Sequence, residues 1–128
     1  MHRRSISVVA ASVAALGLAA LLFGCSSKDS TSPPVTVTGP TFNFTFPQTG
    51  TSHELTFTDV GTWNYVCTTH APGMAGSVTV AAAGPDSVLV HVGPSNSLSF
   101  SPASASVKTG GKVRWVNDSN MSNHTVTR

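Results

Sequence analysis

The chain after residue 34 is predicted to form a small all-β sandwich or barrel. Short runs that alternate apolar and polar residues recur from residue 35 onward, and this period of two is typical of a strand with one buried face. No apolar repeat with helical spacing is found in the same part of the sequence. Glycine, proline, asparagine and serine separate the runs, as the turns of such a fold require.

The expected strands are, in chain order, VTVT, FNFTF, ELTF, WNYVC, SVTV, SVLVHV, SLSF, SVK, KVRWVN and HTVT. Side chains of one parity share a face of a strand, so each run offers one face to a core. In three of the runs this face consists of Phe42, Phe44, Phe46, Leu55, Phe57, Val113 and Trp115. Turns are expected at residues 47–50, 59–61 and 109–111, each of which ends in glycine.

Residues 1–24 have the layout of an export signal. Arg3 and Arg4 precede an apolar stretch at residues 6–23. The sequence LFGC that ends at Cys25 resembles the close of a bacterial lipoprotein signal. This resemblance implies that the signal is removed and that Cys25 carries a lipid. A retained membrane helix and a plainly secreted chain are the alternatives.

Residues 25–34 are rich in serine and end in two prolines, so they are expected to form a tether rather than part of a core. The folded domain is then expected at residues 35–128. A lipid on Cys25 would hold this domain in the cell envelope, in the periplasm or on the outer face of a membrane.

The charges after the leader cancel, which argues against a nucleic-acid partner. The cations are Lys28, Lys108, Lys112, Arg114 and Arg128, and the anions are Asp29, Glu54, Asp59, Asp86 and Asp118. If Cys25 carries lipid, Cys67 is the only thiol left and cannot form an internal disulfide. A lone thiol in an oxidising compartment must be buried, paired with another molecule or bound to a ligand.

The sequence GTWNYVCTTHAPGMAGSVTV, residues 61–80, brings Cys67, His70 and Met74 close together. Cys67 continues the inward parity of a strand, and the other two follow in a loop that contains glycine and proline. Thiolate and thioether favour copper, particularly Cu(I), while imidazole binds both Cu(I) and Cu(II). The group therefore predicts a copper site, provided that a second histidine arrives from elsewhere in the chain.

Other interpretations of these residues are weaker. Zinc sites seldom include a thioether, covalent haem attachment needs two cysteines before the histidine, and no third residue suggests a nucleophilic Cys67–His70 pair. Taken singly, Cys67 could be a small core residue and His70 a loop residue. Their joint occurrence after a strand is what favours metal.

Residues 61–80 resemble the last two strands and ligand loop of the cupredoxins, the blue-copper family. Residues 98–127, LSFSPASASVKTGGKVRWVNDSNMSNHTVT, are similar to that family's first half, which ends at its first ligand histidine. The resemblance implies a Greek-key β-sandwich and one type 1 copper held by Cys67, His70, Met74 and His124. A backbone carbonyl, for example that of Gly73, is the alternative to the Met74 thioether.

The two halves stand in the reverse of the family's order. The chain is therefore interpreted as a circular permutant, in which residues 81–86 join the Cys-His-Met half (35–80) to the first-histidine half (87–128). A scrambled or truncated piece of a two-domain protein is one alternative. A dimer in which two chains exchange halves is another.

The resemblance implies a membrane-tethered electron carrier. Its redox partner proteins would dock weakly and briefly around His70, and the chain would act as a monomer. A module that stores, delivers or senses copper, and a metal-free envelope module, are the alternatives. No enzyme is expected, because a copper oxidase or reductase needs a second copper site and His53 and His91 do not form one. These two histidines and Met121 are expected to be ordinary surface or loop residues.

Overall fold

The structure is a computed structural model that describes residues 39–121 and 123–128. Its elements are β1 (Asn43–Phe46), β2 (Ser52–Phe57), β3 (Gly61–Val66), β4 (Ala75–Ala81), β5 (Ser87–Val92), the short 3-10 helix η1 (Pro94–Asn96), β6 (Phe100–Ser101), β7 (Ser104–Lys108), β8 (Gly111–Asn117) and β9 (His124–Thr127). The all-β class expected from the alternating runs is therefore confirmed.

The strands form two sheets, in the orders β1-β9-β3-β4-β7 and β2-β8-β5-β6. Most neighbouring strands are antiparallel, but β7 lies parallel to β4 and β8 lies parallel to β5. The sheets do not close into a barrel, so the sandwich is the correct one of the two predicted architectures.

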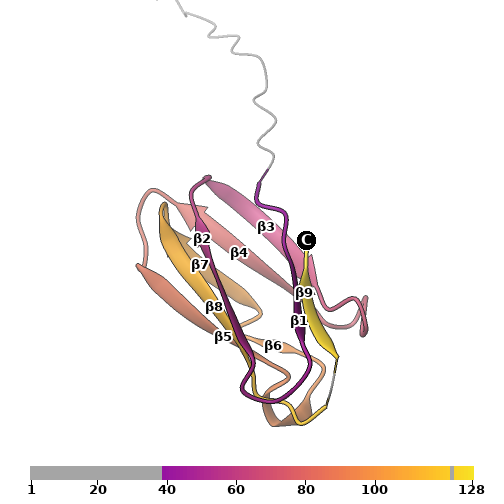
Figure 1. Cartoon of the computed structure of the whole chain (residues 1–128). Helices are drawn as coiled ribbons and strands as arrows, with labels where there is room; N and C mark the ends of the chain where they lie inside the picture. Colours follow the sequence, from indigo (N-terminus) through magenta and orange to yellow (C-terminus); the bar gives the residue numbers. More distant parts are fainter. Residues whose placement is uncertain (1–38, 122) are drawn as a thin grey trace, which may run out of the picture. The chain divides into compact units, whose positions relative to one another are not determined.

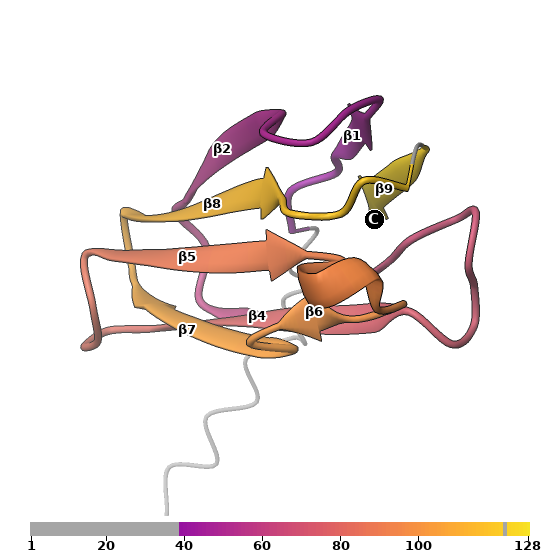
Figure 2. The same cartoon turned by 90° about the horizontal axis from the view of Figure 1, so that it is seen from below.

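Strands from the two ends of the described chain lie side by side. β9, near the C-terminus, lies between β1 and β3, and β8 lies between β2 and β5 (Figures 1 and 2). The earlier strands β1–β4 and the later strands β5–β9 thus contribute to both sheets. As a result, the two halves of the sequence form a single sandwich within one chain.

The registers of β9 decide which residues meet at one end of this sandwich. Phe46 of β1 is paired with His124, and Val66 of β3 is paired with Thr127. Val66 is also paired with Ala75 of β4. Because β3 and β9 are antiparallel, the chain that continues past Val66 into Cys67 runs toward His124 at the start of β9.

One core fills the space between the sheets. Its buried side chains are Phe42, Phe46, Phe57, Trp63, Tyr65, Cys67, Met74, Val78, Val80, Val90, Val92, Phe100, Ala105, Val107, Val113, Trp115 and Val126. Trp115 is central to its aromatic part, with ring centroids 5.7 Å from both Phe42 and Tyr65. Of the side chains predicted to face the core, Phe44 and Leu55 are only partly buried, although they pack against it.

The predicted signal, the lipid-bearing Cys25 and the tether at residues 25–34 lie outside the described residues. Within residues 39–121 and 123–128, no helix has the length and apolar character needed to cross a bilayer.

Candidate metal centre

Cys67 lies at the end of a strand whose alternation carries it into the core. In β3, Trp63 and Tyr65 are buried while Thr62 and Asn64 are exposed. Cys67 continues the buried parity and its side chain is 0 % exposed. A paired strand is a rigid support, so the position of the sulfur is set by β3 rather than by the loop that follows.

The loop after Cys67 is closed by its own backbone. The His70 N–H donates to the Cys67 carbonyl at 3.1 Å, and the Met74 N–H donates to the His70 carbonyl at 3.2 Å. The Cys67 N–H donates to the Met74 carbonyl at 2.9 Å, just before β4 begins at Ala75. These bonds turn the His70 side chain back toward Cys67 and bury the Met74 side chain.

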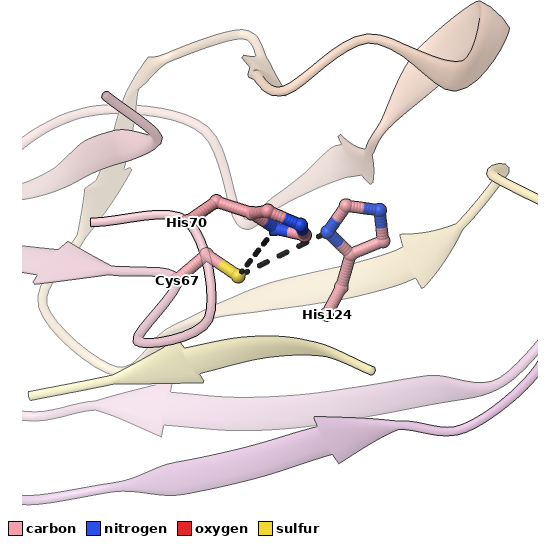
Figure 3. Close-up of side chains that lie close together, drawn as sticks. All are labelled: Cys67, His70 and His124. Carbon is pink, nitrogen blue, oxygen red and sulfur yellow. Dashed lines mark hydrogen bonds between the residues drawn. The ribbon is translucent and has the colours of Figure 1, made fainter. Parts of the chain in front are cut away.

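His124, the first residue of β9, completes the group (Figure 3). Cys67 Sγ lies 3.3 Å from Nδ1 of His70 and 3.9 Å from Nδ1 of His124. The centroids of the two imidazole rings are 4.9 Å apart. A residue that is 57 positions from Cys67 in the sequence is therefore brought to the thiol by folding.

These three donor atoms fit around one metal ion. They lie within 4.8 Å of one another, and Cys67 and His124 are buried while His70 is partly exposed. Ligands about 2.0–2.3 Å from a common ion are separated by roughly 3.3–4 Å in a trigonal or tetrahedral set. Both sulfur–nitrogen distances are in or at the edge of that range, so a metal could be bound with only small side-chain movements.

The surroundings act on two of the three candidate ligands. The Thr125 backbone N–H donates to Cys67 Sγ at 3.3 Å, which helps to fix the position of the sulfur. Histidine binds a metal as the neutral imidazole. Burial, followed by the charge of His70, lowers the pKa of His124. His124 therefore stays neutral, with a lone pair to offer, at pH values where an ordinary histidine begins to protonate.

Gly93, which sequence reasoning missed, supports the His124 ring. It follows β5 with φ +64°, and a Cβ placed on it would lie 2.9 Å from His124 Nε2 and 2.7 Å from Ser119 Cβ. The ring is therefore packed directly against this backbone. Nε2 of His124 is buried and has no hydrogen-bond partner among the described residues. The sequence showed only a glycine at the end of a strand.

The other predicted residues fall into two groups. Met74 is 0 % exposed and closes the ligand loop, and its role as a ligand stays a prediction. The other two described histidines, His53 and His91, do not belong to the candidate metal-binding group. His53 Nε2 lies 3.0 Å from the Thr45 carbonyl, His91 pairs with Asp118, and Met121 is an exposed loop residue. In the described part of the chain, only Cys67, His70 and His124 form a candidate metal-binding group.

Comparisons with protein-family models, curated proteins and solved structures found no match to this chain.

Proposed function

We propose that this chain is a type 1 copper protein that transfers electrons. One observation carries the proposal: a thiol and two imidazoles, contributed by segments 57 positions apart in the sequence, meet in one largely buried cluster. Soft thiolate with imidazole is a donor set that suits both oxidation states of copper. A copper ion bound there would supply a one-electron couple.

Each residue has a proposed role in holding that ion. Cys67 would provide the thiolate, and His70 and His124 the two imidazoles. Met74, buried in the same loop, would provide a distant axial thioether, with the Gly73 carbonyl as the alternative. The strand ends that carry Cys67 and His124 would keep the ligand geometry nearly constant when the ion changes its charge.

Electron exchange would occur through His70. It is the one partly exposed member of the cluster, and the next residues, Ala71, Pro72 and Gly73, are exposed and uncharged. Elsewhere on the domain Lys108 pairs with Asp86 and Lys112 with Glu54. An uncharged surface next to His70 suits weak, brief contacts with redox proteins and little electrostatic steering.

We also propose that the domain is a circularly permuted cupredoxin, exported and held at a membrane by a lipid on Cys25. The support for permutation is that the Cys67 half and the His124 half form one sandwich and one site. The support for the anchor is the leader sequence that ends at Cys25.

The test is to load the full chain with Cu(II) and record its visible absorption and its reduction. We expect an intense blue or green band from thiolate-to-copper charge transfer, and bleaching of this band by one electron per protein, reversed on reoxidation. Cys67→Ser should remove the band, while His91→Gln, a histidine outside the cluster, should leave it unchanged. A wild-type protein that stays colourless and free of copper would refute the proposal.

The exposure of His70 also suits a protein that delivers copper without transferring electrons. The two functions differ in the rate at which the metal leaves. Transfer of Cu(I) to a competing chelator should be slow for an electron carrier and fast for a donor, so one stopped-flow measurement on the loaded chain separates them.

A further inference from the structure

A shallow hollow lies on the outer surface of β3 and β4, beside the start of β7. Its volume is about 390 Å³, near the lower end of the roughly 300–1,000 Å³ that small-molecule sites occupy. In β3 and β4 the buried side chains alternate with outward ones. The outward side chains that line the hollow are Asn64, Val66, Ala75 and Ser77, and the segment that enters β7 adds Ala103 and Ser104.

Pairing between strands holds the lining residues of this hollow together. Asn64 of β3 is the register partner of Ser77 of β4, and Ser77 is paired in turn with Ser104 of β7. The Ser77 backbone N–H also donates to the Ala103 carbonyl at 2.8 Å. The hollow is thus built mainly on paired strands, so its shape does not depend on a ligand.

The lining offers two kinds of contact and no charge. Three of its outward side chains are aliphatic, and the other three carry an amide or a hydroxyl, which both donate and accept hydrogen bonds. Ser77 Oγ donates to Ser104 Oγ at 3.2 Å, so the proton of Ser104 can be donated to a ligand. A charged ligand would lose hydration here without meeting an opposite charge. The hollow therefore suits a neutral ligand that has both C–H and hydroxyl groups.

We propose that this hollow binds one ring of a neutral oligosaccharide. A sugar ring has C–H groups on its faces and hydroxyls around its rim, which matches the two kinds of contact in the lining. The aliphatic side chains contact a face of the ring, while Asn64, Ser77 and Ser104 hydrogen-bond its hydroxyls. Binding is weak, because a shallow site buries less of its ligand than an ordinary pocket does. The inference goes beyond the proposed function and does not rest on it, since no metal ligand takes part.

The test is an NMR titration of the isotope-labelled, metal-free full chain with maltohexaose, cellohexaose and the hexamer of N-acetylglucosamine. We expect at least one of these probes to shift the amide signals of residues 64–66, 75–77 and 103–104, and the shifts to saturate. Asn64→Ala and Ser104→Ala each remove one hydrogen-bonding group and should weaken binding roughly five-fold. Ala103→Leu places a larger side chain in the hollow and should abolish binding.

Thr79→Ala is the matched control. Thr79 is exposed on β4, as the hollow's own residues are, but it lies outside the hollow, where its Oγ1 is 3.3 Å from Thr62 Oγ1. Its removal should leave the affinity for the sugar within about two-fold of wild type. Circular dichroism checks that each variant folds. If Ala103→Leu fails to fold, Asn64→Ala and Ser104→Ala decide.

Four results would overturn the proposal. None of the three neutral probes shifts these amides, or an acidic probe, oligogalacturonate, shifts them more strongly than the neutral ones do. Thr79→Ala weakens binding as much as Asn64→Ala and Ser104→Ala. The same amides shift on dilution without sugar, which would show that a second copy of this chain covers the hollow. Because the titration uses the metal-free chain, a failure to bind copper leaves it valid, and a failure to bind sugar leaves the copper proposal untouched.

Discussion

Replacing Gly93 by alanine tests how firmly the fold holds the His124 ring. Two costs are expected. Alanine at φ +64° adopts a left-handed conformation, which costs about 1–2 kcal/mol. The new Cβ would also lie 2.7 Å from Ser119 Cβ and 2.9 Å from His124 Nε2, well inside the roughly 3.5–4 Å of ordinary carbon contacts. Relief of such crowding in a packed core typically costs about 1–3 kcal/mol more.

Gly110→Ala is the matched control. Gly110 has φ +78°, and a Cβ there would find no atom within 4 Å. It therefore carries the backbone cost without the collision. Urea unfolding of the metal-free proteins should show Gly93→Ala less stable than Gly110→Ala by about 1–3 kcal/mol. The comparison assumes that the unfolding free energies of the two variants depend on urea concentration with the same slope.

The same pair of variants separates the site from the fold. Because the collision acts on the ring of a proposed ligand, Gly93→Ala should also weaken copper binding or shift the visible band. Gly110→Ala should have the wild-type spectrum. Equal stability of the two variants together with identical spectra would show that Gly93 does not position His124.

Three further predictions follow from single features of the fold. Because the pKa of His124 is lowered, the unfolded chain takes up a proton near pH 6.5 while the native chain does not. The unfolding free energy of the metal-free protein should therefore fall as the pH drops below about 6.5, and it should fall more steeply than in His124→Gln. Equal pH dependence of the two proteins would contradict this. Phe42 and Arg128 exchange two backbone hydrogen bonds, so a short turn can join these two residues. A chain joined in this way and opened within residues 81–86 should fold and bind copper, as checked by circular dichroism and metal titration. A chain that neither folds nor binds copper would argue against the permutant interpretation. The buried hydroxyl of Tyr65 has no hydrogen-bond partner of good geometry among the described residues, so Tyr65→Phe should leave the unfolding free energy unchanged or raise it. A loss above about 1 kcal/mol, measured by urea unfolding, would show that the Trp115 indole N–H donates to that hydroxyl.

Local pattern was sufficient to predict most of the strands. Alternation has a period of two, so the buried parity of Trp63, Tyr65 and Cys67 followed directly from the sequence. The same pattern could not choose between sandwich and barrel, because that choice depends on which strands pair. The parallel pairing of β4 with β7 is of this kind, since it joins strands separated by two others in the chain.

The candidate site was only partly accessible to sequence reasoning. Cys67 and His70 are three residues apart, so their proximity is local, whereas His124 was expected at the site only through the cupredoxin resemblance. Gly93 carried no signal, because its importance lies in contacts with Ser119 and His124 that exist only after folding. The axial role of Met74 stays a prediction.

X-ray absorption of the copper-loaded chain, recorded on a sample shown by sedimentation to be monomeric, is the most direct test of the site. We predict one sulfur and two imidazole nitrogens at about 2.0–2.3 Å from the copper, the range of metal–imidazole and metal–thiolate bonds, with one imidazole lost in His124→Gln. A spectrum without a short copper–sulfur distance, or an unchanged spectrum in His124→Gln, would show that Cys67 and His124 do not hold the same ion.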